Sequence, residues 1–313
     1  MRRALTAWAA MLLAIGLSAL PSGAIAQRAH IAPEAATGHS EKSLARAESY
    51  MVSAANPLAV EAGTRVLQEG GSAVDAAIAV QLVLNLVEPQ SSGIGGGAFL
   101  LHWDAEAKEL KTYDGRETAP AAARPDRFLR DGRRIPFDEV VHSGLSIGVP
   151  GLVRLLDDVH RRHGKLPWAR LFEPAITLAE NGFPVSPRLN LLLTWMGAQN
   201  FDPAARRLYF DGNGSAWPVG YRLKNPAFAA TLRRIAEEGA EAFYSGEIAE
   251  KIVTAAANAP NHSGDITLAD LAAYRSVERP PVCVVYRRHR ICGMGPPSSG
   301  GIAVAQTLKL LEP

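Results

Sequence analysis

The stretch EGGSAVDAAIAVQLVLNLVEPQSSGIGGGAF, residues 69–99, decides the fold together with YDGRETAP, residues 113–120. Ser72 and Asp75 have the spacing of a capping box, which predicts that a helix begins here. Residues 73–87 are apolar on nearly every face of that helix. We therefore expect it to be buried inside the protein.

A polar hairpin follows the glycines at the end of the first stretch. We expect residues 98–103 and 110–113 to be its two strands. Arg116 comes directly after them, between Asp114 and Glu117. Because a guanidinium can grip a carboxylate with two hydrogen bonds, Arg116 is our candidate for binding a small acidic substrate. The alternative is a structural ion pair with either acidic neighbour.

The glycine cluster, residues 93–97, with Ala98 after it, imitates a dinucleotide-binding fingerprint. That motif needs a strand before the glycines and a helix after them, and this chain has the reverse order. A nucleotide site is therefore not expected. Two interpretations stay open, namely a tight turn with close backbone packing and a wall of a substrate pocket.

Length and charge exclude further classes of partner. The chain has 313 residues, 47% of them hydrophobic, which is enough for a proper core. Lys and Arg number 33 against 31 Asp and Glu, and the balance is 31 against 31 without Arg2 and Arg3. Since no positive charge is in excess, neither nucleic acid nor a membrane surface is expected as a partner.

The N-terminus has the pattern of an export signal. Two arginines precede an apolar run at residues 7–20, and small residues at 24–26 fit a cleavage site. The run is shorter than the ~20 residues of a membrane-spanning helix. We expect residues 1–26 to be a signal peptide, residues 27–49 a flexible arm, and the mature protein to be periplasmic or secreted.

The two cysteines, Cys283 and Cys292, fall on two expected strands, residues 282–285 and 290–293. A turn between these strands pairs the cysteines directly. A disulfide is then conceivable in an exported protein. Free buried thiols are the preferred interpretation, because direct cross-strand disulfides are often strained. We expect no metal site, since no histidines lie at ligand spacing.

Helical periodicity dominates the second half, and we expect helices at residues 151–163, 167–180, 226–238 and 242–257. His160 and His163 suit the last turn of the first of these, where positive charge complements the helix dipole. Asp157 and Asp158 are expected on its solvated face. The sequence GLSIG around Ser146 matches a nucleophile elbow but lacks the strand before it and the helix directly after it, so a catalytic Ser146 is not expected.

Six segments resemble, in order, the γ-glutamyltranspeptidases, also called glutathione hydrolases. They are GGSAVDAAIA (70–79), EPQ with GIGGGAF (88–99), YDGRETAP (113–120), VPGLV (149–153), GDITLADLAAYRSVERPP (264–281) and PPSSGGIAV (296–304). The likeness covers about residues 50–312. Several motifs in a fixed order make coincidence a poor explanation.

The resemblance implies the N-terminal nucleophile (Ntn) hydrolase fold, a four-layer αββα sandwich. This chain would form it incompletely, as an α+β structure with a large helical section. Residues 50–313 would be the front of a large subunit, and Arg116 would hold the α-carboxylate of the γ-glutamyl group. No threonine here has the family's processing-site context, so we expect the nucleophilic threonine beyond Pro313 and no activity from this chain alone.

The function implied for a complete enzyme is γ-glutamyl transfer from, or hydrolysis of, glutathione and related compounds. Its partner would be the missing small subunit or C-terminal half, and no metal or organic cofactor is implied. Two alternatives stay open. One is a cephalosporin-acylase-like amide hydrolase of the same fold, and the other is a non-catalytic, incomplete fragment.

Overall fold

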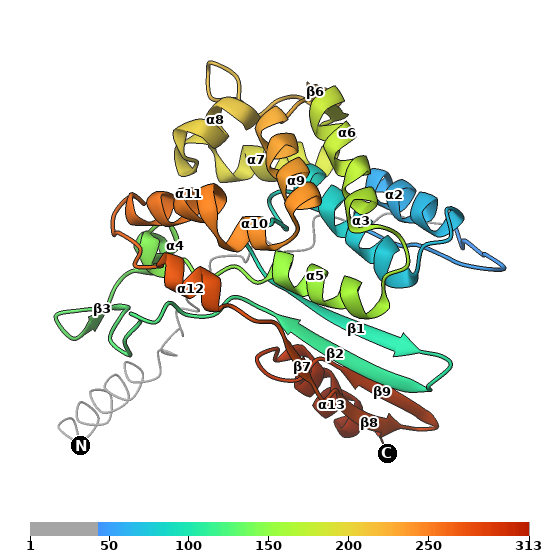
Figure 1. Cartoon of the computed structure of the whole chain (residues 1–313). Coiled ribbons are helices and arrows are strands. Elements are labelled where there is room, and N and C mark those ends of the chain that lie inside the picture. Colours follow the sequence, from blue (N-terminus) through green and yellow to red (C-terminus); the bar gives the residue numbers. More distant parts are fainter. Residues whose placement is uncertain (1–42, 313) are drawn as a thin grey trace, which may run out of the picture. The chain divides into compact units, whose positions relative to one another are not determined.

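The computed structural model describes residues 43–312 (Figure 1). The expected signal peptide and most of the expected arm lie outside the described residues. Residues 43–49 are exposed and belong to no helix or strand. Within the described part of the chain, no helix is long and apolar enough to cross a membrane.

Two helices, α2 (Pro57–Gln68) and α3 (Ala73–Val87), open the fold. Asn56 caps α2 with its side chain, and the proline that follows is compatible with the first helical position. The predicted capping box of α3 is confirmed. Ser72 Oγ accepts the N–H of Asp75 at 3.1 Å, and Asp75 Oδ2 accepts the N–H of Ser72 at 2.8 Å. These local bonds fix where α3 begins.

The predicted hairpin is confirmed as β1 (Ala98–Asp104) and β2 (Glu109–Gly115), and β7 (Val277–Arg279) pairs with the other edge of β2. All three strands are antiparallel. Helix α5 (Leu152–His163) covers this sheet (Figure 1). A Cβ at Gly115 would lie 2.5 Å from Leu155 Cβ, so only glycine allows α5 to approach the end of β2 this closely.

Further helices surround this centre. They are α4 (Phe137–Val141), α6 (Glu173–Asn181), α7 (Pro187–Met196), α8 (Pro203–Tyr209), α9 (Pro226–Glu238), α10 (Glu241–Tyr244), α11 (Gly246–Ala257) and α12 (Leu268–Ala273). Short 3₁₀ turns and strand pairs join them: η1 (Gly144–Ser146), η2 (Trp168–Phe172), η3 (Ala198–Asn200), β3 (Leu129–Arg130) with β4 (Arg133–Arg134), and β5 (Phe183–Pro184) with β6 (Arg222–Leu223).

Two expected helices were wrong in their continuity. Residues 167–180 divide into the 3₁₀ turn η2 and the helix α6, where Pro174 occupies the first turn of α6. Proline is tolerated in a first turn but not in a helix interior. Residues 242–257 are interrupted at Ser245, whose backbone is extended, and Gly246 follows with φ +65°.

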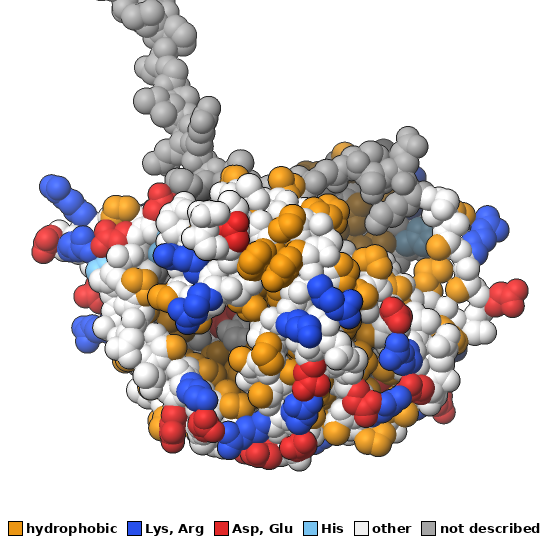
Figure 2. All heavy atoms as spheres, turned by 90° about the horizontal axis from the view of Figure 1, so that it is seen from above, with side chains coloured by type: hydrophobic (Ala, Val, Ile, Leu, Met, Phe, Trp, Pro, Cys, Tyr) orange, Lys and Arg blue, Asp and Glu red, His pale blue; other side chains and the backbone are white. Residues whose placement is uncertain are grey.

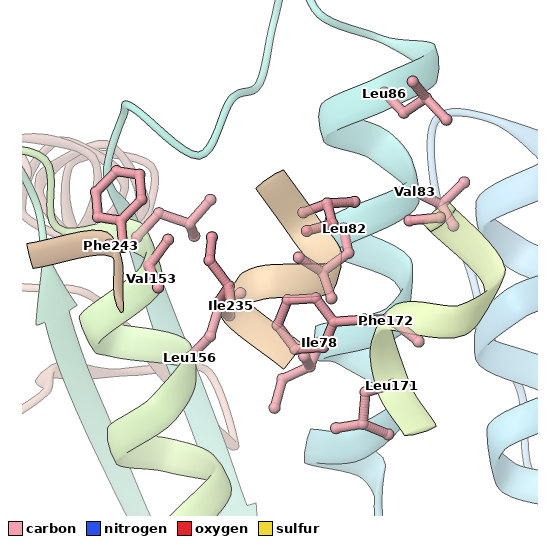
Figure 3. Packing of buried hydrophobic residues seen from close by; sticks show 14 of the residues in the cluster. Ile78, Leu82, Val83, Leu86, Val153, Leu156, Leu171, Phe172, Ile235 and Phe243 are labelled. Carbon is pink, nitrogen blue, oxygen red and sulfur yellow. The ribbon is translucent and has the colours of Figure 1, made fainter. Parts of the chain in front are cut away.

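The hydrophobic core lies where α3 meets α5, α6, α9 and the turn η2. Figure 3 shows side chains from these elements converging, among them Ile78, Leu82, Phe172 and Ile235. Ile78 and Ile235 are fully buried. The sequence-based expectation that α3 is interior is therefore confirmed, and this core holds the β1–β2 sheet against the helices.

The chain ends with the hairpin of β8 (Val282–Tyr286) and β9 (His289–Gly293), followed by α13 (Gly300–Leu310), which packs on it (Figure 1). The predicted register is confirmed, because Cys283 lies directly opposite Cys292. The preference for free thiols was wrong, since the two sulfurs form a disulfide. Direct pairing places the Cα atoms of the two cysteines 4.1 Å apart.

The solvated-face expectation for Asp157 and Asp158 was also wrong. Both are only partly exposed, at 16% and 20% of their side-chain surface. Arg161 forms an ion pair with each of them, and Asp157 also lies 3.9 Å from the buried guanidinium of Arg154.

On the face seen in Figure 2, acidic and basic side chains are interspersed, so that face carries no continuous basic surface.

Candidate carboxylate-binding site

Arg116 stands immediately after β2 with its side chain exposed to solvent. Its Nη1 donates a long hydrogen bond, 3.5 Å, to the carbonyl of Pro297. Among residues 43–312 no carboxylate forms an ion pair with Arg116. The alternative interpretation, a structural ion pair with a neighbour, is therefore wrong for Asp114, which instead accepts from Nε of Arg279 at 2.7 Å. The guanidinium is left able to bind a ligand.

The backbone of Arg116 is held tightly although its side chain is exposed. Its N–H donates to Asp114 Oδ1 at 2.9 Å, and its carbonyl accepts from the Tyr274 hydroxyl at 2.7 Å. Gly97 lies against the same segment, because a Cβ there would come within 2.6 Å of the Gly115 carbonyl and 2.8 Å of Arg116 Cα. The close-packing interpretation of the glycine cluster is confirmed at Gly97.

A pocket of about 650 Å³ opens beside Arg116, a volume typical of small-molecule sites. Its charged lining residues are Arg116, Glu117, Arg124 and Arg127. Arg127 is engaged elsewhere, since it binds Asp265 with two hydrogen bonds of 2.6 and 2.7 Å. Those bonds hold the pKa of Asp265 below its usual range. Arg124 pairs with Asp126 at 3.6 Å, so within the described part of the chain Arg116 is the lining arginine without a carboxylate partner, and its guanidinium can attract an anionic ligand.

A second pocket, of about 440 Å³, is also lined by Glu117. Gly93, Gly96 and Gly97 contribute to its wall, so the glycine cluster also lines a cavity. The buried carboxylate of Glu88 faces this pocket, together with other polar side chains. The glycine cluster therefore both packs closely against the neighbouring backbone and forms part of the wall of a pocket, the two interpretations that the sequence left open.

Other candidate residues of the sequence are occupied with local contacts. Ser146 ends the 3₁₀ turn η1, not a strand, and its Oγ donates to the Ser143 carbonyl at 3.0 Å, so the nucleophile elbow is absent as expected. His160 and His163 do lie in the last turn of α5. His163 also stacks on His102, with ring centroids 4.1 Å apart. Among the described residues no cluster of His, Cys, Asp or Glu is arranged to hold a metal ion.

Sequence reasoning missed three residues that build the site. Tyr274 and Arg279 come from the far end of the described chain, and Gly151 makes room for Tyr274. Tyr274 and Arg279 both lie in the GDITLADLAAYRSVERPP segment. That segment carried the family resemblance but no expected role, and only the pairing of β7 with β2 brings it to Arg116.

Comparison with known proteins agrees with this architecture. The mixed α+β fold is similar to that of gamma-glutamyltranspeptidase from Helicobacter pylori, with a TM-score of 0.81 and 34% sequence identity over 86% of this chain and 76% of that chain. It is also similar to the transpeptidase CapD of Bacillus anthracis, with a TM-score of 0.70 and 35% identity over 85% of this chain and 82% of that chain. The fold thus places the protein in the Ntn hydrolase class.

The family follows from the sequence comparison. The model of the family described as Gamma-glutamyltranspeptidase matches residues 59–313, and the chain belongs to that family. The glutathione hydrolase proenzyme of Bacillus subtilis is 38% identical over 263 residues, which are 84% of this chain and 44% of that protein. The chain therefore spans less than half the length of this relative.

Proposed function

We propose that this chain supplies the carboxylate-binding part of an enzyme that transfers or hydrolyses γ-glutamyl groups, with glutathione and related compounds as substrates. The observation that carries the proposal is the geometry of Arg116. Its backbone is fixed by two hydrogen bonds, whereas its guanidinium is exposed beside a pocket and has no carboxylate partner among residues 43–312. Because the chain belongs to the Gamma-glutamyltranspeptidase family, the ligand proposed for this guanidinium is the carboxylate of a γ-glutamyl compound.

In this proposal the guanidinium of Arg116 binds the α-carboxylate of the γ-glutamyl group with two parallel hydrogen bonds. Such a pair fixes both the position and the orientation of the substrate, which a lysine could not do. The γ-amide carbonyl would then lie where a nucleophile can attack it. The guanidinium of Arg116, which lines the pocket and has no carboxylate partner among residues 43–312, supports an anionic substrate.

The nucleophile is proposed to come from sequence outside this chain, as an N-terminal threonine activated by its own amine. Its hydroxyl oxygen would attack the γ-carbonyl, and the amine of the leaving group would depart with a proton. The resulting ester would pass its γ-glutamyl group to water or to the amine of an acceptor. On this account the described residues bind and orient the substrate but do not perform the attack.

Association with a complementing chain or segment is supported by exposed surface. Strand β1 is an edge of its sheet, because within the described part of the chain it pairs with β2 alone. Leu101 and Trp103 on β1 are 44% and 57% exposed, and Leu310 and Leu311 at the end of α13 are 86% and 66% exposed. Unpaired strand edges and apolar side chains of this kind favour pairing with further structure.

Two other proposals remain. A cephalosporin-acylase-like amide hydrolase is favoured by the likeness to cephalosporin acylase from Bacillus halodurans, which has a TM-score of 0.67 and 30% identity over 81% of this chain and 48% of that chain. A non-catalytic, incomplete product is the second. Under either catalytic proposal, the pattern of residues 1–26 supports export to the periplasm or the medium.

The test is hydrolysis of a chromogenic γ-glutamyl anilide by the mature chain, alone and mixed with a separately expressed small subunit from a family member. Activity in the mixture alone supports the proposal. Activity of the chain alone contradicts the claim that the nucleophile lies elsewhere. Silence in a mixture that gel filtration shows to have assembled favours the non-catalytic product. Cleavage of a cephalosporin side-chain amide, but not of the anilide, favours the acylase.

A further inference from the structure

The position of the exposed Arg116 guanidinium depends on the two peptide groups that flank Arg116. Those groups are held from both sides by buried side chains. Asp114, which is 6% exposed, accepts the N–H, and Tyr274, which is 4% exposed, donates to the carbonyl. Neither contact uses the guanidinium. The backbone is thereby anchored without occupying the group that would bind the ligand.

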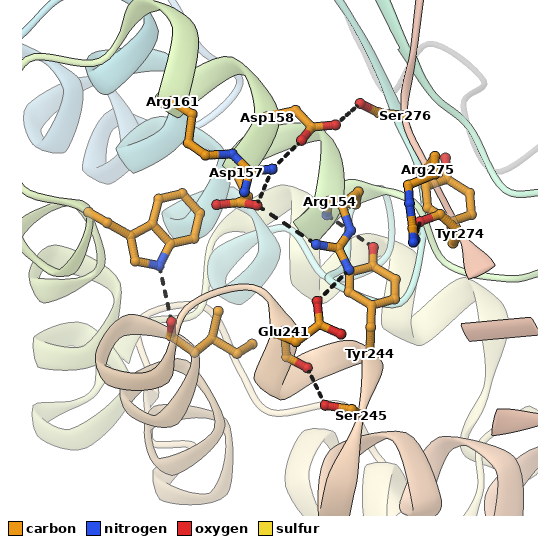
Figure 4. Close-up of polar contacts among 12 residues, drawn as sticks. Arg154, Asp157, Asp158, Arg161, Glu241, Tyr244, Ser245, Tyr274, Arg275 and Ser276 are labelled. Atoms are coloured by element: carbon orange, nitrogen blue, oxygen red, sulfur yellow. Dashed lines mark hydrogen bonds and ion pairs between the residues drawn. The ribbon is translucent and has the colours of Figure 1, made fainter. Parts of the chain in front are cut away.

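The hydroxyl of Tyr274 is itself held by packing. Its ring lies parallel to the ring of Tyr244, with an interplanar angle of 8° and centroids 6.0 Å apart (Figure 4). A Cβ at Gly151 would lie 2.1 Å from the hydroxyl oxygen of Tyr274, so only glycine leaves room for it. Burial raises the pKa of Tyr274, and the phenol stays protonated as a donor.

The second anchor comes from the same short segment. Arg279 lies on β7, five residues after Tyr274, and its Nε donates to Asp114 Oδ2 at 2.7 Å. Asp114 therefore uses one oxygen for Arg279 and the other for the N–H of Arg116. The register of β7 on β2, which pairs Asp114 with Val277, sets this arrangement. Residues 274–279 thus control both peptide groups of Arg116.

We propose that Tyr274 is a positioning residue for substrate recognition, and that with the Arg279–Asp114 pair it fixes the direction in which Arg116 presents its guanidinium to a ligand carboxylate. This inference rests on the proposed function, because it needs Arg116 to bind the α-carboxylate. It adds to that function a specific role for the Tyr274 hydroxyl. Loss of the Tyr274 hydroxyl must weaken recognition of the carboxylate specifically.

Tyr244 provides a matched control. It is 1% exposed, and its hydroxyl donates to the Pro150 carbonyl at 3.0 Å, accepts the N–H of Arg154 at 3.0 Å, and forms no hydrogen bond with Arg116. Tyr244→Phe and Tyr274→Phe each remove one buried hydroxyl and keep the ring. Both are expected to lower the melting temperature of the chain, Tyr244→Phe more strongly because its hydroxyl makes two hydrogen bonds and that of Tyr274 makes one. Only Tyr274→Phe is expected to change ligand preference.

The experiment measures binding of two ligands by titration calorimetry to the mature chain assembled with a family small subunit whose N-terminal threonine is replaced by alanine, so that the ligands are not consumed. One is γ-glutamyl-p-nitroanilide, and the other is the same compound with its α-carboxylate converted to a neutral amide. The quantity compared is the ratio of the two dissociation constants. We expect the wild type to favour the carboxylate, Tyr244→Phe to keep that ratio, and Tyr274→Phe to reduce it roughly tenfold. Arg279→Ala, on a partly exposed strand, is expected to reduce it as well.

The outcomes separate the two claims. If the wild type binds neither ligand or shows no preference, or if Arg116→Ala keeps the preference, the proposed function fails and the inference fails with it. If Arg116→Ala abolishes the preference while Tyr274→Phe and Arg279→Ala behave like Tyr244→Phe, the proposed function stands and the positioning role is wrong. Should Tyr274→Phe not fold, Arg279→Ala alone decides between the same results.

Discussion

Replacement of Asp75 by alanine is expected to destabilise the chain more than any other capping substitution. Asp75 is fully buried at the start of α3. Its Oδ2 accepts three backbone N–H groups, from Ser72 at 2.8 Å, Lys165 at 2.8 Å and Leu166 at 3.1 Å. One carboxylate therefore both caps α3 and ties the loop after α5 to it.

The magnitude follows from these three bonds. A hydrogen bond to a charged group contributes about 1.5–3 kcal/mol, and a donor left without a partner in the interior costs about 1–3 kcal/mol. Because the loop donors are only partly buried and water can reach them, we take the lower end for each. Asp75→Ala should then cost about 3–5 kcal/mol. For a chain of this size, that lowers the melting temperature by roughly 10 °C.

The assay is thermal unfolding of the full chain followed by circular dichroism. The matched control is Asp270→Ala, because Asp270 closes a capping box with Thr267 at the start of α12 in the same way, but with an exposed partner and with one distant N–H, from Ala121 at 2.9 Å, in place of two. That change should cost about 1–2 kcal/mol. Equal losses for Asp75→Ala and Asp270→Ala would refute the reasoning, since they would show that the burial and the second loop contact of Asp75 add nothing.

Three further changes have defined outcomes. Gly151→Ala places a Cβ 2.1 Å from two oxygen atoms and should cost at least about 3 kcal/mol in urea unfolding, whereas Gly212→Ala, with open space around it, should cost less than about 1 kcal/mol. Burial, and then the adjacent histidine on β1, lower the pKa of His163 in the folded chain. Because the unfolded chain then binds a proton at this histidine more readily, the stability of the fold should fall as the pH drops below about 6.5. The melting temperature of His163→Gln should fall less over the same pH range. Thiol titration of the unfolded, unreduced chain should find no free thiol at Cys283 or Cys292, and reduction should cost about 2–3 kcal/mol; two free thiols per chain would contradict the assigned disulfide.

Much of the fold was predictable because its signals are local. The capping box of Ser72 and Asp75 predicted the start of α3. Another local signal, a capping residue followed by proline, begins α7 at Ser186 and α8 at Asp202, where no helix was expected. The interruption at Ser245 was not predictable in this way. It depends on an extended backbone at one residue that tertiary packing selects.

The candidate site was predictable only in part, for the same physical reason. Arg116 could be named because its residue type and family motif suffice to suggest carboxylate binding. The contacts that hold it could not, because Tyr274 and Arg279 are more than 150 residues away in the sequence. Their approach depends on the register of β7. Likewise, the expected strand register predicted that Cys283 lies opposite Cys292, but it did not predict that a disulfide joins them.

The central claim is that Arg116 binds the substrate carboxylate. The most direct measurement is kcat/KM for the γ-glutamyl anilide in the assembled enzyme, for Arg116→Ala against Arg133→Ala, a control on the exposed strand β4. Loss of a charged hydrogen-bonding partner should lower kcat/KM at least about a hundredfold for Arg116→Ala, and Arg133→Ala should match the wild type. Equal values of kcat/KM for wild type and Arg116→Ala would contradict the account.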